Sequence, residues 1–395
     1  MLNHHDTQHM PPATASRRIV IVGAGIGGLA AAVALTRAGH DVHVFERNAD
    51  VEGEGGALTI WPNALTALGR IGLAGAVASL GNELRSLVIT SRQGRVLTRF
   101  DVEAAARDYG YPMIAIRRAD LLRALVEAFG RNRIHLGAAC AGLTQDSGAV
   151  RARFADGREV QADVLIGADG TGSAVRKHLC SRAALRYAGY RVYSGVTPAG
   201  AEVIDLHEFR ETWGRGLRFA VMSLSNDEVF WGAYRNGPAR EPDDPGARQG
   251  ELARAFDGWG DETRRLIRES RGPIVRKDAV TLTPLSAWSH GRVTLLGDAA
   301  HAMTPNAGQG ACQAIEDAVI LARSLAEDAD VERALRRYET LRRCRTRRVS
   351  AAAERYGRLV QNAHPLVCAL RDAAARAVPS GLHAWQMAWS MRFPE

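Results

Sequence analysis

The segment from Arg17 to Arg47, RRIVIVGAGIGGLAAAVALTRAGHDVHVFER, constrains the fold more than any other part of the chain. It contains a short apolar run, a cluster of glycines, an alanine-rich amphipathic stretch and a second apolar run that ends in an acid. This order predicts a strand, a turn, a helix and a second strand. Gly23, Gly25 and Gly28 have the G-x-G-x-x-G spacing of a dinucleotide-binding turn, and Gly27 is an additional glycine.

Each glycine of this pattern has a physical role in holding a dinucleotide. Gly23 permits the tight turn, Gly25 lets the backbone approach a diphosphate, and Gly28 lets the helix lie close to the strand. The unpaired N–H groups at the helix start then favour the phosphate charge. Glu46, at the end of the second strand, is placed to accept hydrogen bonds from a ribose diol. These residues predict a dinucleotide site and leave open whether it holds FAD or NAD.

Two Asp-Gly pairs in the segment AVRARFADGREVQADVLIGADGTGSAVR have different surroundings. Asp156-Gly157 lies between the alternating stretches RARF and REVQ, which predicts a hairpin turn. Asp169-Gly170 follows the apolar run VLIG and precedes a loop of small residues and Arg176. Because open α/β sheets bind ligands where buried strands end in such loops, the pattern favours a cofactor-binding role for Asp169 over a structural one.

The segment RVTLLGDAAHAMTPNAGQGACQAIEDAVILARSL repeats the order of strand, acid, glycine-containing loop and helix. Asp298 is placed to accept a hydrogen bond from a ribityl hydroxyl, and the glycines leave N–H groups free at a helix start near Gly308 to Ala311. A reduced flavin is anionic at one edge of its ring, so such a helix start stabilises it by about 1 kcal/mol. NAD has no such requirement, and this segment therefore favours a flavin.

Together the three segments resemble those of the single-component flavoprotein monooxygenases that share the para-hydroxybenzoate hydroxylase fold. The matching pieces are GAGIGG with Glu46-Arg47, GADGTGSAVR and GDAAHAMTPNAGQGACQAIEDA, and they extend from Arg17 to about Leu325. Within this family the chain is more similar to the FAD-dependent urate hydroxylase and zeaxanthin epoxidase branch, through GGALTIWPNALTALGRIGL, RYAGY and GRGLRFAVMSL.

The resemblance also implies which residues contact the cofactor. To Gly23, Gly25, Gly28 and Asp169 it adds FAD contacts from Gly27, Glu46, Arg47, Thr59, Arg118, the backbone of Cys140, Asp298, Ala307, Gly308, Gln309, Gly310 and Ala311. Arg117 is an alternative to Arg118 in this set.

The chain departs from the urate enzymes in its substrate region. Their arginine is matched by Arg218, but their tyrosine on the following strand corresponds to Phe230, and their asparagine falls in the stretch Val192 to Ser194. A purine pocket has therefore lost polar partners, which predicts a more apolar or aromatic substrate near Arg218 and Phe230. Two roles stay open for Arg218: holding a substrate phenolate or carboxylate, or forming a salt bridge at a sheet edge.

The expected fold is α/β, with a Rossmann-like FAD-binding domain of the glutathione reductase type, an inserted and mainly antiparallel β-sheet substrate domain, and a C-terminal helical segment. Residues 1–16 are polar and predict a flexible tail. The FAD-binding domain is expected to comprise residues 17–80, 108–182 and 284–330, the substrate domain residues 81–107 and 183–283, and the helical region residues 331–395.

Composition narrows the remaining classes. The five cysteines show neither the close pairs of a zinc site nor a disulfide framework, so no metal site is predicted. No apolar run has the length of a signal-peptide core or a membrane span, and we expect a cytoplasmic monomer or homodimer. The net charge of +8 is carried almost entirely by arginine. The arginine run from Arg336 to Arg348 is expected to be a solvated helix face, with no nucleic-acid partner.

The expected activity is that of an FAD-dependent monooxygenase. No second G-x-G-x-x-G follows a strand, so NAD(P)H is expected to dock transiently, reduce the flavin and leave. O2 then forms a flavin C4a-hydroperoxide that hydroxylates or epoxidises a small aromatic or polycyclic substrate. No side chain is assigned as a catalytic base. The alternatives are another flavoenzyme on this scaffold, such as a halogenase or reductase, and a non-catalytic FAD-binding redox module.

Overall fold

The computed structural model describes residues 11, 13, 15–51, 56–198, 204–225, 227–377 and 389–394. Most of the expected N-terminal tail, residues 1–10, 12 and 14, lies outside the described residues, as do residues 378–388 of the expected C-terminal helical region. No described helix combines the length and the apolar composition that crossing a bilayer requires.

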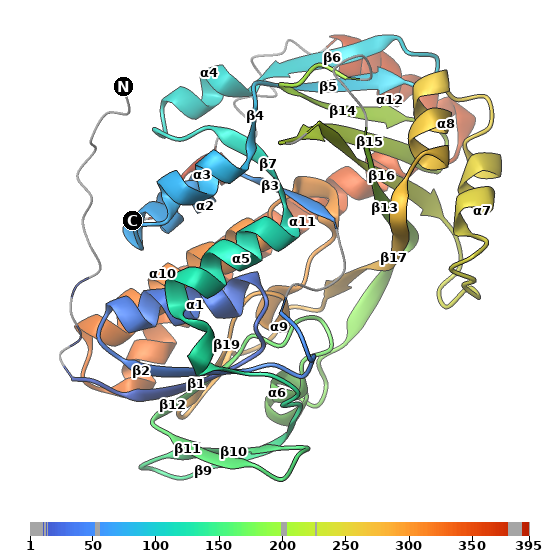
Figure 1. Ribbon diagram of the computed structural model, residues 1–395. Helices are drawn as coiled ribbons and strands as arrows, with labels where there is room; N and C mark the ends of the chain where they lie inside the picture. Colours follow the sequence, from blue (N-terminus) through green and yellow to red (C-terminus); the bar gives the residue numbers. More distant parts are fainter. Residues whose placement is uncertain are drawn as a thin grey trace.

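The described residues form nineteen strands and twelve α-helices (Figure 1). The strands are β1 (Arg18–Val22), β2 (Asp41–Phe45), β3 (Ala57–Ile60), β4 (Asn82–Leu84), β5 (Ser86–Ser91), β6 (Val96–Asp101), β7 (Met113–Arg117), β8 (Ile134–His135), β9 (Cys140–Gln145), β10 (Val150–Phe154), β11 (Glu159–Ala162), β12 (Val164–Gly167), β13 (Leu185–Pro198), β14 (Glu208–Trp213), β15 (Leu217–Leu224), β16 (Glu228–Asn236), β17 (Arg271–Leu282), β18 (Ser289–His290) and β19 (Val293–Leu295). The helices are α1 (Ile26–Arg37), α2 (Pro62–Arg70), α3 (Ala74–Leu80), α4 (Val102–Arg107), α5 (Arg118–Phe129), α6 (Ala174–Leu179), α7 (Arg248–Ala255), α8 (Asp261–Arg268), α9 (Asp298–His301), α10 (Gly310–Glu327), α11 (Val331–Val360) and α12 (Pro365–Ala377), with 3-10 turns η1 (Arg131–Arg133) and η2 (Pro305–Ala307).

One six-stranded sheet has the order β18-β19-β12-β1-β2-β8, and all its neighbours are parallel except β18 and β19. Strand β1 is its centre, and four of its five residues are buried because both faces of the sheet are covered. Helices α1, α5 and α10 lie on one face, and the three-stranded sheet β11-β10-β9 lies on the other (Figure 1). This arrangement places the ends of β1, β12 and β19 next to the starts of α1, α6 and α9.

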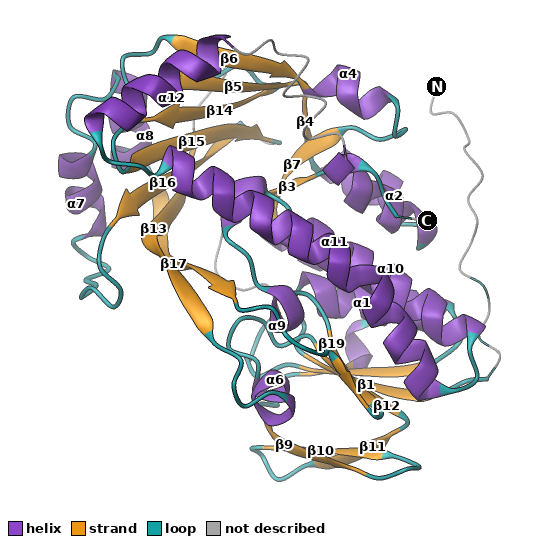
Figure 2. Cartoon of the chain, turned by 180° about the vertical axis from the view of Figure 1, so that it is seen from behind, coloured by secondary structure: helices purple, strands orange, loops and turns teal. Residues whose placement is uncertain are grey.

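A second sheet of seven strands has the order β17-β13-β16-β15-β14-β5-β6 and is antiparallel apart from the β14–β5 pair. Helices α7 and α8 cover one face, where Phe219 and Trp231 pack with Phe256 and Trp259. The other face turns toward the six-stranded sheet and its helices (Figure 2). A small sheet, β3-β7-β4, connects the two halves.

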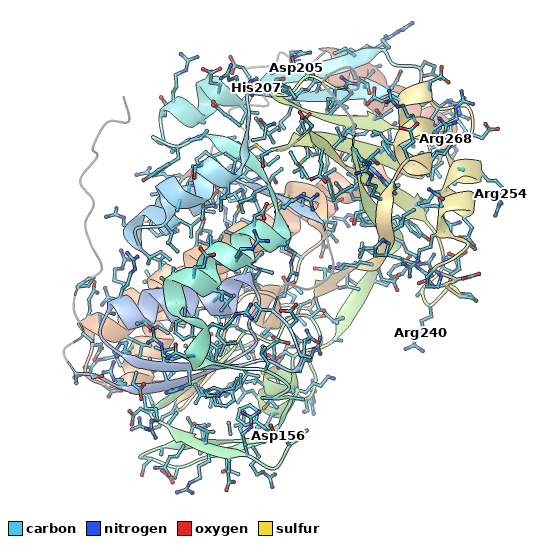
Figure 3. All side chains as sticks on the ribbon, viewed as in Figure 1. Asp156, Asp205, His207, Arg240, Arg254 and Arg268 are labelled. Atoms are coloured by element: carbon cyan, nitrogen blue, oxygen red, sulfur yellow. The ribbon has the colours of Figure 1, made fainter. Side chains whose placement is uncertain are left out.

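The expected α/β class, with a Rossmann-like FAD-binding part, a mainly antiparallel sheet and C-terminal helices, is confirmed. The division of the chain into domains with the bounds given above stays a prediction. The hairpin at Asp156-Gly157 is also as expected: Gly157 has φ +87° and joins β10 to β11. Asp156 lies in the loop at one end of this small sheet (Figure 3).

Candidate functional site

The turn between β1 and α1 is shaped by glycines that leave no room for side chains. A Cβ on Gly23, which has φ +106°, would lie 2.4 Å from the carbonyl oxygen of Ala168, and a Cβ on Gly28 would lie 2.0 Å from that of Gly23. By contrast, a Cβ on Gly25 would meet no atom within 4 Å. Gly25 is the N-cap of α1, and no side chain caps the helix. The turn is therefore closely packed against the protein but open at the helix start, which is the arrangement that a phosphate requires.

Glu46 closes this turn from the end of β2. One carboxylate oxygen accepts a hydrogen bond from the backbone N–H of Ala24 at 2.8 Å, and the other accepts one from that of Asn48 at 2.9 Å. A carboxylate has about four acceptor positions, so Glu46 keeps capacity for a ribose hydroxyl. Arg47, next to it, is exposed.

A second open helix start lies at α10. No side chain caps this helix, and a Cβ on Gly310 would meet no atom within 4 Å. Gly308 has φ +62°, and a Cβ there would come within 2.7 Å of the Thr59 hydroxyl. The loop before α10 is thus pressed against β3, while its first turn faces open space. Two uncapped helix starts at the same side of the sheet can hold two anionic parts of one extended ligand.

Asp298 begins α9 at the end of β19. Its side chain is exposed to solvent, yet burial raises the pKa of its carboxyl group, an effect that His301, Lys277 and Arg176 oppose. The two observations agree if the carboxylate faces an open space that protein surrounds.

Arg118, the first residue of α5, lies between the acids of the two motifs. Burial lowers the pKa of its guanidinium, and Asp298 and Glu46 oppose this shift. Within the described part of the chain, that guanidinium has no hydrogen bond and no ion pair. The neighbouring Arg117 instead donates to Glu228 at the start of β16, at 2.7 Å. Of the two arginines, Arg118 is therefore the one available to a diphosphate.

Asp169 has partners that the sequence did not indicate. One carboxylate oxygen accepts from the Ser173 hydroxyl, and the other accepts from the backbone N–H groups of Ala174 at 2.7 Å and Val175 at 3.2 Å. Asp169 thus caps α6 and shapes the loop that packs on Gly23. This geometry supports the structural alternative, and a direct contact between Asp169 and the cofactor stays a prediction.

Arg176 is a residue whose role sequence reasoning missed. It is 3% exposed, and its guanidinium donates to the carbonyl oxygen of Ala299 at 3.0 Å and to that of Asp298 at 3.4 Å. It therefore ties α6 to the loop that carries Asp298. The segment GADGTGSAVR shows that Arg176 follows the loop, but its partners in α9 lie more than a hundred residues away in the sequence.

The other predicted FAD contacts lie around the same two helix starts. Gly27 lets α1 approach α10, because a Cβ there would lie 2.7 Å from Leu296 and 3.0 Å from Ala314. Cys140, at the start of β9, is half-buried, and burial raises the pKa of its thiol. Ala307 ends η2, and Gln309 and Ala311 flank Gly310; the Gln309 side chain is buried and accepts from Asn63 at 3.1 Å. The contacts of these residues with FAD stay predictions.

A buried ionic cluster joins α10 to α11, and it corrects the expectation of a solvated helix face from Arg336 to Arg348, because Arg342 within that run is fully buried. Arg342 of α11 forms ion pairs with Glu316 and with Asp317 of α10, and all three side chains are fully buried. Asp317 also accepts from the backbone N–H of Gly297 at 3.0 Å and pairs with His301 at 2.6 Å. Burial would raise the pKa of Asp317, but His301 and Arg342 outweigh it and lower the pKa to about 2. The cluster fixes the loop of Asp298 to the helix behind it.

The seven-stranded sheet presents an apolar surface toward these helix starts. Phe230 pairs with Val196 and Met222 across neighbouring strands, so the three side chains share one face. Phe230 and Val196 pack against the core of the other half of the molecule. Tyr234 lies further along the same face, and burial raises the pKa of its hydroxyl. Phe230, a predicted substrate residue, thus lies on the face of the seven-stranded sheet that points toward the starts of α1 and α10.

Arg218 lies on the same face but is fully buried. Its guanidinium donates to Glu211 at 3.2 Å, to Gln361 at 2.8 Å and to Asn306 at 2.6 Å, and it lies 4.0 Å from the ring centre of Tyr234. Glu211 balances the positive charge of this guanidinium, and each of its three nitrogens donates to a protein group. Of the two roles left open by the sequence, the geometry supports the ion pair, and a substrate contact stays a prediction.

His207 and His301 are also placed by the structure. His207 contacts the backbone oxygen of Glu83 at 2.8 Å and lies with Asp205 at the outer end of the seven-stranded sheet (Figure 3). His301 is held by Asp317 in the cluster described above. Both histidines are thus engaged in contacts within the protein.

These features fit FAD. The two uncapped helix starts, the open space at Gly25 and Gly310, and the half-buried guanidinium of Arg118 match the charges of a diphosphate and of a reduced flavin ring.

Comparisons with known proteins agree with this geometry. The family model described as FAD binding domain matches residues 17–354. The aurachin C monooxygenase/isomerase of Stigmatella aurantiaca is 38% identical over 363 residues, which cover 92% of this chain and 94% of that protein. The FAD-dependent urate hydroxylase of Mycolicibacterium vanbaalenii is 35% identical over 332 residues, covering 82% and 84%. Klebsiella pneumoniae HpxO complexed with FAD and uric acid has a TM-score of 0.89 at 28% identity, covering 95% of this chain and 96% of that one.

Proposed function

The chain belongs to the FAD-binding-domain family of flavoprotein monooxygenases, and from this premise we propose that it oxygenates a small, uncharged aromatic or polycyclic compound, with NAD(P)H as electron donor and O2 as oxidant. The protein is an FAD-dependent monooxygenase, as its relatives are. Family membership favours this activity over a halogenase, a reductase or a non-catalytic redox module. What the proposal adds is the electron donor and the class of substrate.

Different residues would bind different parts of the cofactor. Arg118 and the start of α1 would bind the diphosphate, Glu46 a ribose, and Asp298 the ribityl chain, while the start of α10 would face the edge of the flavin ring. Bound FAD supplies hydride acceptance from NAD(P)H and the activation of O2. The buried ionic cluster behind α10 holds these groups in place, because Asp317 fixes the backbone of Gly297.

The proposed substrate class rests on one observation, the ion pair that Arg218 already forms within the protein. An anionic substrate needs an unpaired cation or several donors, and on this face the guanidinium of Arg218 is already paired with Glu211. Phe230, Met222 and Val196 offer apolar surface instead. Such a surface excludes water from the reacting atoms and orients a flat ring by its shape. Burial raises the pKa of the Tyr234 hydroxyl, which therefore stays protonated at neutral pH, so Tyr234 could donate a hydrogen bond to a substrate and would not act as a base.

The test is a comparison of ligands on the purified, flavin-loaded protein. We expect 2-naphthol, a neutral bicyclic phenol, to stimulate the oxidation of NADH or NADPH and to gain one oxygen atom by mass spectrometry. Salicylate, 4-hydroxybenzoate and urate should stimulate it less. Aurachin C, named in one relative, belongs in the same panel. A preference for the carboxylates or for urate would contradict the substrate class, and a failure to oxidise either nucleotide with any ligand would contradict the proposed electron donor.

A further inference from the structure

Helix α12 carries an apolar stripe on its outer side. Leu366 and Leu370 are 69% and 72% exposed, and the exposed Ala373 and Ala377 continue the stripe at helical spacing. Val367 is exposed beside them. Single exposed leucines are ordinary, but a whole helix face of apolar residues indicates an interaction surface.

The inner side of α12 is fixed to the protein, so the helix cannot turn to bury this stripe. Arg371 donates to the carbonyl oxygen of Gly214 at 3.2 Å and to that of Val360 at 3.1 Å, and its guanidinium lies 5.0 Å from the ring centre of Trp213. Ala375 packs with Trp213 and Val360 in a separate small apolar cluster. Figure 2 shows α12 lying across β6, β5 and β14 on the outside of the molecule.

Exposed arginines surround the stripe. The end of β14 at Trp213 pairs with Ser91, so the β5–β6 turn and the β14–β15 turn lie at the same end of the sheet as α12. The last turns of α11 precede α12 in the chain and add Leu359, which is 48% exposed. We call the following residues the α12 surface: Leu359, Leu366, Val367 and Leu370 at its centre, and Arg92, Arg95, Arg215, Arg358 and Arg376 at its rim.

The charge of the α12 surface is one-sided. Its five rim arginines are exposed, and none of them makes an ion pair with any residue that the structure describes. In residues 90–96, 213–217 and 355–377 the sequence holds one carboxylate, Asp372, and Arg371 pairs with it at 2.8 Å. An apolar centre with a cationic rim complements a surface that is apolar below an anionic layer.

We propose that the α12 surface docks the protein on an anionic lipid bilayer, with Leu366 and Leu370 entering the interface and the rim arginines meeting the headgroups. A second copy of the chain fits this surface less well. A two-fold dimer would place each arginine rim close to the other, and Asp372, the one acid in these segments, is already paired with Arg371 and does not relieve the repulsion. Docking of this kind is independent of the reaction, so its failure would leave the proposed function untouched.

The test measures sedimentation of the flavin-loaded protein with vesicles. We expect binding to vesicles of phosphatidylcholine and phosphatidylglycerol in equal amounts, weaker binding as salt is added, and little binding to phosphatidylcholine alone. The double variant Leu366→Asp with Leu370→Asp should bind at least about 10-fold less. Both leucines are highly exposed, so the variant should fold and keep its flavin. Leu206→Asp, at another exposed leucine that is 46% exposed, is the matched control and should bind like the wild type.

A second pair of variants tests the charge. Arg215→Glu with Arg376→Glu should reduce binding at least about 10-fold, because each arginine near an anionic surface contributes about 1 kcal/mol. Arg240→Glu with Arg254→Glu, at the outer edge of α7 and the loop before it (Figure 3), should change binding less than about 2-fold. The proposal is overturned if the wild type ignores anionic vesicles, or if both control variants lose binding as much as the test variants. It is also overturned if the wild type is a dimer that the Leu366 and Leu370 substitutions dissociate.

Discussion

Arg118 and Arg218 stand on opposite sides of the space between the two large sheets, and they are in opposite states. The guanidinium of Arg118 is half-buried and has no partner among the described residues, whereas that of Arg218 is fully buried and bound by Glu211, Gln361 and Asn306. The cofactor side thus leaves charge and backbone donors open for a ligand. On the sheet side, the donors of Arg218 are taken up by groups of the protein itself. From this difference we infer that the cofactor is recognised by charge and, as proposed above, the substrate by shape and apolar contact.

The largest effect should come from filling the open helix start on the cofactor side. Gly25→Val adds a side chain where no protein atom lies within 4 Å, so the fold should keep its stability within about 0.5 kcal/mol. The same side chain occupies the space that a diphosphate needs, and we expect FAD affinity to fall by about 1000-fold or more. The ratio of flavin to protein absorbance after purification measures the loss, and circular dichroism checks the fold.

Gly75→Ala is the matched control for this variant. Gly75 also has open space around its Cβ position, but it lies in α3, away from both helix starts. It should retain a full complement of flavin. If Gly25→Val retained flavin too, the start of α1 would not hold the diphosphate.

The second effect concerns stability on the sheet side. Arg218→Met leaves the carboxylate of Glu211 buried and unpaired, which should lower the free energy of unfolding by about 3 to 5 kcal/mol. The double variant Glu211→Gln with Arg218→Met removes the orphaned charge and should recover at least half of that loss. Urea unfolding of the flavin-loaded proteins measures both. A single variant with unchanged stability and lost substrate affinity would show instead that Arg218 contacts the substrate.

The same contrast explains how much the sequence could predict. Around Gly23, Glu46 and Asp298 the function depends on short segments in which glycines and an acid have fixed spacing, so the FAD-binding half was predictable. The environment of Arg218 is assembled from β14, α11 and the loop before α10, up to 143 residues apart, and no local pattern indicates it.

Two other features were unpredictable for the same physical reason. Whether Arg117 or Arg118 faces the cofactor depends on Glu228, more than a hundred residues away. Asp169 resembles a ligand-binding acid because an Asp that follows a buried strand looks the same in sequence whether it caps a helix or binds a ligand.

Lowering the pH should destabilise the part of the protein that contains β1 and β2, because His40, which directly precedes β2, becomes protonated. Burial lowers the pKa of His40 to about 4, and Arg17 adds to the shift. This pKa in the folded protein lies below the unfolded value of about 6.5, so the unfolded chain takes up a proton more readily. The contribution of the neutral histidine to folding stability is therefore fully present above about pH 6.5. That stability is lost as pH falls from 6.5 toward 4, by about 3 kcal/mol in all. Unfolding free energies measured across this range should show the slope.

His40→Gln should flatten this dependence, because glutamine does not titrate. Its stability at neutral pH should fall by about 1 kcal/mol, since the backbone N–H of Arg17 contacts Nδ1 of His40 at 3.3 Å. An unchanged slope would place the acid-sensitive group elsewhere, for example among the carboxylates on the sheet side.

The smallest effect gives the sharpest comparison, because it separates adjacent residues. Arg118→Met removes a charged donor and should weaken FAD binding by about 10- to 100-fold, which corresponds to about 1.5 to 3 kcal/mol for a hydrogen bond to a charged group. Arg117→Met removes an ion pair with Glu228 in which both side chains are partly exposed, so it should cost at most about 1 kcal/mol of stability and leave FAD affinity within about 2-fold. Titration of the apoprotein with FAD, followed by flavin fluorescence, measures both constants. The carbonyl of Gly56 accepts a hydrogen bond from the backbone N–H of Arg118 at 3.0 Å. Equal losses of FAD affinity in the two variants would mean that both arginines act through the backbone at Gly56. Recognition of the charge of FAD would then depend on the two helix starts alone.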